Sequence, residues 1–212
     1  MAHLTIVGVG PGSKEYLTRA AESAIDQADV LVGGHRQIQM FSPLPAEKIA
    51  ITSELVPVLH LIKNKALNGE KVVVLSSGDP GFYGILATIK RHLPDLNVTV
   101  IPGISSVQIA CARIGIAWDD AVLTSCHGRD ILPLVAAVKE HNKVITLTGT
   151  KQNPTAIARA LLEGGTGNKT VYLACNLSYQ DEAIISTDLK QLSSSSLDRN
   201  NFNNCVMVIY SE

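Results

Sequence analysis

The sequence predicts an α/β protein made of two α/β domains with a ligand cleft between them. Short β-branched runs alternate with segments in which apolar residues recur at helical spacing. The strand-like runs are almost continuously apolar, which is typical of parallel strands covered by helices on both faces. The segment 116–121, "IAWDDA", interrupts this rhythm and divides the chain into domains 1–115 and 116–212. Ligand pockets favour the space between domains, which is where we expect the cleft.

The first domain alternates strands and helices regularly. Strands are expected at 3–10, 29–34, 47–52, 71–77 and 97–103, and helices at 14–28, 54–69, 83–93 and 105–115. Gly69 is a typical stop signal for the second helix, and Pro57 fits its first turn. Ser105 or Ser106 can cap the last helix.

The second domain begins with the same alternation and then changes. Strands are expected at 121–129, 143–149, 169–178, 182–192 and 204–212, with a short helical start at 188, and helices at 130–142 and 153–165. Asn153 is a candidate cap for the latter helix, with Pro154 in its first position. Because three late strands have little helix between them, we expect an antiparallel or mixed edge. The polar stretch 193–204 is typical of an exposed loop.

Composition excludes several classes of function. The 212 residues are 46% hydrophobic and 17% charged, and 18 basic against 19 acidic residues give a net charge of −1. No general field therefore attracts nucleic acid or an anionic membrane, so neither is an expected partner. The N-terminus lacks a basic leader and no apolar run is long enough for a membrane span, so the expected location is cytoplasmic.

Cysteine and histidine spacing predicts no bound metal. Cys111, Cys126, Cys175 and Cys205 form no C-x-x-C pair. In a cytosolic protein they are expected to be buried or inert thiols. The six histidines show no H-E-x-x-H spacing, so the expected metal site is none.

Three glycine-rich loops follow strands of the first domain. They are "GVGPGS" (8–13), "SSGDPGFYG" (76–84) and "PGISS" (102–106). Loops after parallel strands emerge at one edge of the sheet, and glycine lets a ligand approach the main chain closely. Each loop alone is commonly a tight connection only. Three at one edge favour a small-molecule site.

Familiar nucleotide motifs fit the first loop poorly. A dinucleotide motif needs G-x-G-x-x-G, and Ser13 stands where the third glycine belongs. The acid expected at the end of the next strand is missing, since "DVLVGG" ends in glycine. No G-K-[ST] follows the glycines, so a Walker A loop is absent.

The three loops together resemble those of the tetrapyrrole methylases. The shared features are G-x-G-P-G, G-D-P-x-x-Y-G and P-G-x-S-S, in that order, and the resemblance runs over essentially the whole chain. It implies methyl transfer from S-adenosyl-L-methionine (SAM) to a corrin or porphyrin precursor by a homodimer. Segments 30–38, "VLVGGHRQI", and 125–130, "SCHGRD", are similar to the branch that methylates C5 of precorrin-7 or its cobalt form. The fused C15 methyltransferase and decarboxylase of some relatives would be a separate partner here.

The resemblance also implies a set of cofactor-binding residues, some from motifs and others from strand position. They are Pro11, Gly78, Asp79, Phe82, Tyr83, Ser105 and Ser106 from the motifs, and Leu147, Thr148 and Asn176 from strand position. The Asp79 carboxylate suits the ammonium group or ribose hydroxyls of SAM. Its plain alternative is an acid that merely closes its own turn.

Substrate contacts are inferred from charge. The macrocycle carries acetate and propionate groups, which arginine binds with two parallel hydrogen bonds. The candidates are Gly10, His35, Arg36, His127 and Arg129, with Lys151 as a further possibility. His127 is also the candidate base for removing the C5 proton, and its alternative is a structural histidine. For Arg36, Arg129 and Lys151 the alternative is an exposed, solvated charge.

Other functions remain open at this point. A methylase of the same fold acting at another position, such as on uroporphyrinogen III or in diphthine synthesis, would carry similar loops. A non-enzymatic nucleotide-binding sensor would carry them too, but would show no turnover.

Overall fold

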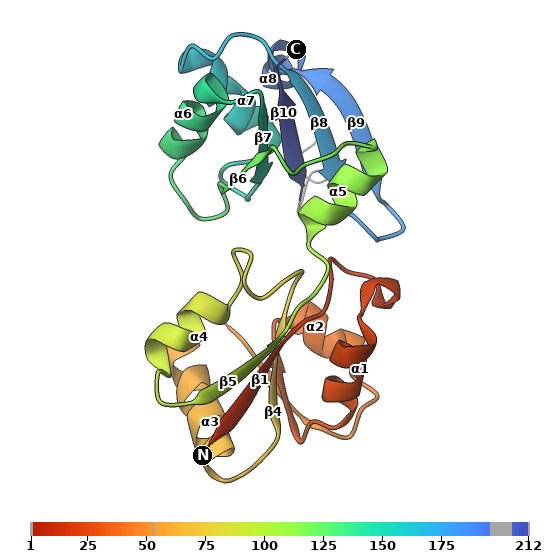
Figure 1. Ribbon diagram of the computed structural model, residues 1–212, viewed down its shortest axis with the longest axis vertical. Coiled ribbons are helices and arrows are strands. Elements are labelled where there is room, and N and C mark those ends of the chain that lie inside the picture. The colour runs from red at the N-terminus through yellow and green to blue at the C-terminus, as the bar shows by residue number, and fades with distance from the viewer. Residues whose placement is uncertain (1, 53, 196–204, 212) are drawn as a thin grey trace. The chain divides into compact units, whose positions relative to one another are not determined.

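The computed structural model describes residues 2–52, 54–195 and 205–211 (Figure 1). The chain divides into two compact units, Met1–Ser105 and Ser106–Glu212. The sequence instead suggested a division after 115. Helix α5 (Ser106–Ile114) contacts β10 of the second unit. The segment after it is tied to that unit as well, since Lys143 Nζ donates to the Asp120 carboxylate at 2.5 Å and to the Ala117 carbonyl at 2.9 Å.

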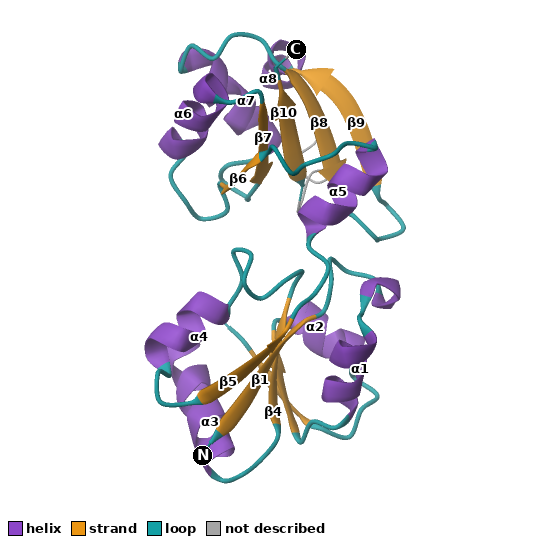
Figure 2. Cartoon of the chain, viewed as in Figure 1, coloured by secondary structure: helices purple, strands orange, loops and turns teal. Residues whose placement is uncertain are grey.

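The first unit contains a five-stranded parallel sheet in the order β3-β2-β4-β1-β5. Its strands are β1 (His3–Gly8), β2 (Val30–Gly33), β3 (Glu47–Ala50), β4 (Val72–Ser76) and β5 (Asn97–Ile101). Every residue of β2 and β4 is buried, as expected for strands covered on both faces. The predicted parallel sheet is confirmed (Figure 2).

Helices cover both faces of this sheet. They are α1 (Arg19–Asp26), α2 (His35–Met40), α3 (Leu55–Leu67) and α4 (Leu86–His92), with the 3₁₀ turn η1 at Lys14–Tyr16. Residues of α1 and α2 pack in one apolar cluster, and residues of α3 and α4 in another.

Two predicted helices of this unit begin later than expected. The predicted helix 14–28 is interrupted at Leu17 because Thr18 starts α1 as its N-cap, accepting from the Ala21 amide at 3.1 Å. The predicted helix 83–93 starts only at Leu86, since Tyr83 has φ of 52°, which a right-handed helix excludes.

The second unit contains a mixed sheet in the order β6-β7-β10-β8-β9. Its strands are β6 (Val122–Ser125), β7 (Lys143–Leu147), β8 (Thr170–Cys175), β9 (Ala183–Asp188) and β10 (Val206–Tyr210). Only β6 and β7 pair in parallel, and β10 lies between β7 and β8, antiparallel to both. The expected mixed sheet is confirmed. The predicted loop 193–204 falls largely outside the described residues, and its first two residues complete α8.

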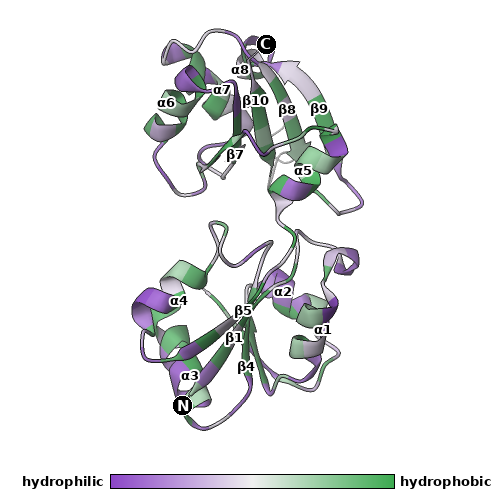
Figure 3. Cartoon of the chain, in the orientation of Figure 1, coloured by the Kyte–Doolittle hydropathy of each residue, from purple (hydrophilic) through white to green (hydrophobic). Residues whose placement is uncertain are grey.

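Helices cover this sheet as well. Helices α6 (Leu132–Glu140), α7 (Pro154–Glu163) and α8 (Leu189–Ser194) pack with Met207 and Ile209 of β10 in one cluster. Val208 faces the other way, toward the side where α5 lies. Asn153 caps α7, accepting from the Ala156 amide at 2.9 Å, as predicted. Figure 3 shows central strands that are mainly apolar, with polar residues concentrated on helices and loops.

Two cysteines contradict the expectation of free thiols. Cys175 and Cys205 form a disulfide, with their Cα atoms 4.1 Å apart. The register pairs Val206 with Ala174, which places Cys205 directly opposite Cys175 on the neighbouring strand. Spacing rules for cysteine look along the chain, so they miss neighbours across strands. Cys111 and Cys126 are buried thiols, as expected.

Candidate functional site

The three glycine-rich loops of the first unit meet at the carboxyl edge of its sheet. Strand β1 lies between β4 and β5. The loop that follows β1 is therefore flanked by the loops that follow β4 and β5. The Gly78 amide donates to the Gly10 carbonyl at 2.8 Å, and the Val9 amide donates to the Ser76 carbonyl at 2.9 Å. The predicted convergence of the loops is confirmed.

Glycine is required where the loops touch, because main chain lies directly against main chain. A Cβ on Gly103 would lie 2.2 Å from the Gly78 carbonyl oxygen, and one on Gly8 would lie 2.5 Å from the Gly103 amide nitrogen. No real side chain fits at such distances. Gly8 and Gly103 are therefore required where the loops meet, although neither was among the individual site residues predicted from the sequence.

Asp79 links two of the loops through its carboxylate. One oxygen, Oδ1, accepts from the Gly81 amide at 2.8 Å and closes the turn of its own loop. The other, Oδ2, accepts from the Gly103 amide of the third loop at 3.2 Å. The carboxylate is thus held by two backbone donors, and the lone pairs it retains are the only part of it that a ligand can use.

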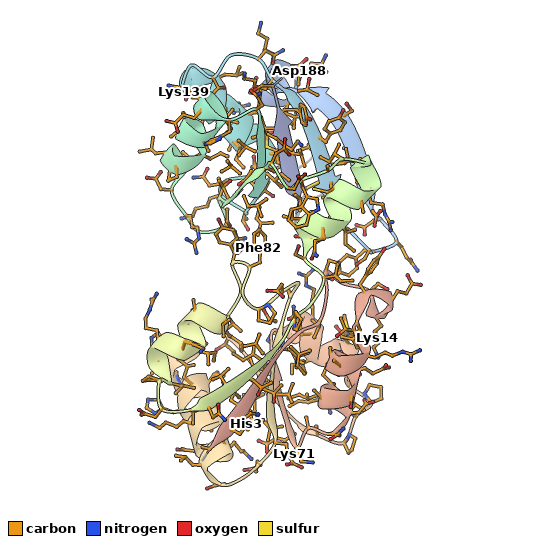
Figure 4. All side chains as sticks on the ribbon, in the orientation of Figure 1. His3, Lys14, Lys71, Phe82, Lys139 and Asp188 are labelled. Carbon is orange, nitrogen blue, oxygen red and sulfur yellow. A yellow bond between two sulfur atoms is a disulfide. The ribbon has the colours of Figure 1, made fainter. Side chains whose placement is uncertain are left out.

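The second loop carries two aromatic side chains beyond Asp79. The Phe82 and Tyr83 rings meet edge to face, with centroids 4.9 Å apart. Tyr83 is exposed and has a left-handed backbone conformation. This conformation is costly for a bulky residue, and strained residues of this kind are found mainly at functional sites. Figure 4 shows Phe82 at the tip of its loop.

The remaining predicted residues of the first unit lie around the same edge. Pro11 is partly buried in the first loop, and Ser105 is buried at the end of the third. His35 and Arg36 are exposed in the first turn of α2. Sequence reasoning missed Gln37, whose Nε2 donates to Ser77 Oγ and ties α2 to the second loop. The sequence feature that could have indicated Gln37 is its position about one helical turn after Gly33 and Gly34.

Strands β6, β7 and β8 of the second unit share one direction, so their carboxyl ends also meet at one edge. The Cys126 amide after β6 donates to the Leu147 carbonyl at 2.8 Å. Thr148 donates to the Cys205 carbonyl from its amide at 3.0 Å and from its hydroxyl at 2.9 Å. Asn176 follows Cys175 directly. The second-unit candidates therefore share one edge of their own sheet.

The candidate base and substrate residues of this edge are exposed. His127 and Arg129 lie in the turn after β6, where the His127 amide donates to Ser125 Oγ at 3.3 Å. Lys151 is exposed in the loop after β7. The neighbouring thiol of Cys126 is buried, and this burial raises its pKa, so it is not an activated nucleophile.

Sequence reasoning also missed the side chains that shape the loop after β8. Glu182 accepts from the Ser178 amide at 2.6 Å and from Arg113 Nε of α5 at 2.5 Å. The Arg113 guanidinium holds the pKa of the Glu182 carboxyl below its ordinary value. No sequence motif marks this pair, which is 69 residues apart.

One surface cavity lies away from the loops. It has a volume of about 420 Å³ and opens at the amino edge of the first sheet, where His3, Thr5 and Lys71 line it. None of the predicted site residues lines it. Among the described residues, no group of three potential metal ligands lies together, and no helix is long and apolar enough to cross a membrane.

These features match one family. Residues 3–193 match the family model of the Tetrapyrrole (Corrin/Porphyrin) Methylases, and the chain belongs to this family. Similarity is high to the cobalt-precorrin-7 C(5)-methyltransferase of Salmonella typhimurium, at 38% identity over 85% of this chain and 88% of the relative. A probable cobalt-precorrin-7 C(5)-methyltransferase of Methanocaldococcus jannaschii is 36% identical over 89% of this chain and 90% of the relative.

A solved structure shares the fold. The uroporphyrin-III C-methyl transferase from Thermus thermophilus, complexed with S-adenyl homocysteine, superposes with a TM-score of 0.80. The match covers 99% of this chain and 97% of the other, at 18% identity. At that identity the likeness concerns the fold.

Proposed function

We propose that this protein is a SAM-dependent C-methyltransferase that methylates C5 of cobalt-precorrin-7, or of precorrin-7, in cobalamin biosynthesis. The observation that carries the proposal is the meeting of three glycine loops at one sheet edge, within a chain that is 38% identical to a C5 methyltransferase. Identity at this level over most of both chains favours the C5 branch over other members of the family.

The residues of the first edge fit the chemical groups of SAM. Gly8 and Gly103 let the three loops pack main chain against main chain, which gathers the backbone donors and acceptors of the loops at one edge, where a nucleoside can bind them. The Asp79 carboxylate offers its remaining lone pairs to the ammonium group or the ribose hydroxyls. We assign cofactor contacts to Pro11, Gly78, Asp79, Phe82, Tyr83, Ser105, Ser106, Leu147, Thr148 and Asn176.

Bound SAM supplies a methyl group already activated by its sulfonium. The protein is left to align the accepting carbon with that methyl group and to exclude water. We assign contacts with the carboxylate-bearing macrocycle to Gly10, His35, Arg36, His127 and Arg129. The two arginines suit this role because arginine pairs with carboxylates through two hydrogen bonds. His127 is the candidate acceptor of the C5 proton. Full turnover of His127→Gln across the pH range would exclude it.

Turnover assays test the proposal directly. The protein is incubated with SAM and a panel of tetrapyrroles, including uroporphyrinogen III and both forms of precorrin-7, and the products are weighed by mass spectrometry. We expect a single added methyl group on precorrin-7 or its cobalt form. Methylation of uroporphyrinogen III instead would assign another branch of the family, and SAM binding without any methylation would indicate a sensor.

The role of Asp79 is tested by binding. Asp79→Ala is expected to weaken SAM binding by about tenfold or more, since hydrogen bonds to a charged group contribute about 1.5–3 kcal/mol. Asp95→Ala is the matched control, because Asp95 is an exposed carboxylate of the same unit whose ion pair, with Lys63, is long at 3.7 Å. Equal affinity of the Asp79 variant and the control in calorimetry would reject the role.

We further infer a cytoplasmic homodimer that works with a separate C15 methyltransferase and decarboxylase. The support is the family resemblance, together with a charge balance that favours no membrane. Sedimentation equilibrium at micromolar concentration is expected to give twice the mass of one chain. A mass of one chain would reject the dimer.

A further inference from the structure

The loop between β8 and β9, residues 176–182, has an unusual backbone. Asn176 has φ of 49° and Ser178 has φ of 69°, both left-handed. Asparagine tolerates this region, but serine adopts it far less readily. Such conformations persist only where surrounding contacts impose them, and they concentrate at functional sites.

Contacts within the loop fix the Asn176 side chain. Its Nδ2 donates to Asp181 Oδ2 at 2.7 Å, while its backbone carbonyl accepts from the Tyr179 amide at 3.0 Å. Leu177 is buried and anchors the loop. Because the amide nitrogen is bound to Asp181, the oxygen Oδ1 on the other side of the group is the atom left to accept a hydrogen bond.

Glu182 imposes the conformation at Ser178. Its Oε2 accepts from the Ser178 amide at 2.6 Å, and its Oε1 accepts from Arg113 Nε at 2.5 Å. The Glu182 side chain is only 20% exposed. The carboxylate therefore connects the left-handed turn to helix α5, and the cation on α5 keeps it ionised and in place.

We propose that Glu182 is a positioning residue for cofactor binding: by holding the Ser178 amide against Arg113, it fixes the turn that presents Asn176 Oδ1 to a hydrogen-bond donor of SAM. This inference rests on the proposed function. The donor class is a hydroxyl, amino or ammonium group, because Oδ1 can only accept.

Calorimetry with SAM and steady-state kinetics test the proposal on the full chain. Glu182→Ala is expected to weaken SAM binding and raise the KM for SAM about tenfold, with kcat at saturating SAM unchanged. Asn176→Ala is expected to act similarly. Because Glu182 works through Asn176, the two effects should not add. The affinity of the double variant for SAM should equal that of whichever single variant, Glu182→Ala or Asn176→Ala, binds less tightly.

Controls separate positioning from folding. Glu140→Ala removes an exposed glutamate at the end of α6 in the same unit and should leave SAM affinity unchanged. If Glu182→Ala does not fold, Glu182→Gln replaces it, since glutamine keeps an acceptor for the Ser178 amide but loses the charge opposite Arg113. This variant should lie between the wild type and Asn176→Ala in affinity.

Three results overturn the proposal in distinguishable ways. Wild-type protein that does not bind SAM overturns both the proposed function and this inference. Wild-type protein that binds SAM, with unchanged affinity in folded Glu182 variants, overturns the inference alone. Additive losses in the Asn176 and Glu182 double variant also overturn it, because they show that Glu182 does not act through Asn176.

Discussion

The two units build their sheet edges by different means. In the first unit the loops pack main chain against main chain at Gly8 and Gly103, where an added Cβ would lie 2.5 Å or less from a neighbouring backbone atom. In the second unit the edge is held by side chains: the Cys175–Cys205 disulfide, the Thr148 hydroxyl and the Arg113–Glu182 pair. The first edge has no room for a side chain at these two glycines, whereas the second distributes its stability over several separable interactions.

The first prediction breaks the main-chain edge and has the largest expected effect. Gly103→Ala would place a Cβ 2.2 Å from the Gly78 carbonyl oxygen. We expect the free energy of unfolding to fall by about 3 kcal/mol or more, because neither backbone can move aside. Urea denaturation measures it.

Gly69→Ala is the control for that variant. Gly69 has φ of +82° with nothing within 4 Å of an added Cβ, so only the left-handed strain, about 1–2 kcal/mol, should appear. Equal losses at the two positions would show that the backbone contact has no special weight.

The second prediction removes the Cys175–Cys205 disulfide from the edge of the second sheet. The disulfide closes a loop with a sequence separation of 30 residues, and Cys205→Ala is expected to lower the free energy of unfolding by about 2–4 kcal/mol. Adding reductant should destabilise the wild type by a similar amount and leave the variant unchanged. A wild type that is no more stable than Cys205→Ala, and that reductant does not affect, would show that these cysteines are thiols in solution.

The third prediction compares a feature that both units share, a helix capped at its N-terminus by a side chain. Thr18 caps α1 in the first unit and Asn153 caps α7 in the second, each accepting from a backbone amide. Alanine at either position is expected to cost about 1 kcal/mol in thermal or urea unfolding. Asn64→Ala, exposed within α3, should cost nothing, and a large difference between the two caps would show that the units differ in more than their edges.

The fourth prediction concerns acid and has the smallest effect. Arg113 holds the pKa of Glu182 below its ordinary value of 4.5, so the unfolded chain binds the proton more readily than the folded one. The stability that Glu182 contributes is therefore complete above pH 4.5 and is lost as the pH falls through the lower, folded pKa. Glu182→Gln should lessen the pH dependence of unfolding in this window. An unchanged dependence would contradict the assignment.

The contrast between the two edges also explains what the sequence reveals. Gly and Pro punctuate the first unit in short local motifs, so its parallel sheet and the meeting of its loops are predictable. The role of Glu182 depends on Arg113, which is 69 residues away, and no local pattern encodes it. The disulfide depends on strand register, which only the folded sheet defines.

Smaller differences have local causes. Helix α2 has six residues and no side-chain cap, so it lacks the periodicity and the boundary signal from which helices are predicted. The late start of α4 follows from the backbone at Tyr83, which the sequence gives no reason to expect at an aromatic residue. Asp79 shows how two interpretations can both hold, since it closes its own turn and also bridges to Gly103.

Strand β10 fills the middle of the second sheet although it comes last in sequence. During synthesis on the ribosome, β7 and β8 emerge well before the strand that joins them, and each exposes an unpaired edge until then. The first unit has all five of its strands by Ile101 and can fold while the chain is still being made. The second unit must wait for β10, so the nascent protein stays vulnerable to aggregation until that strand has emerged.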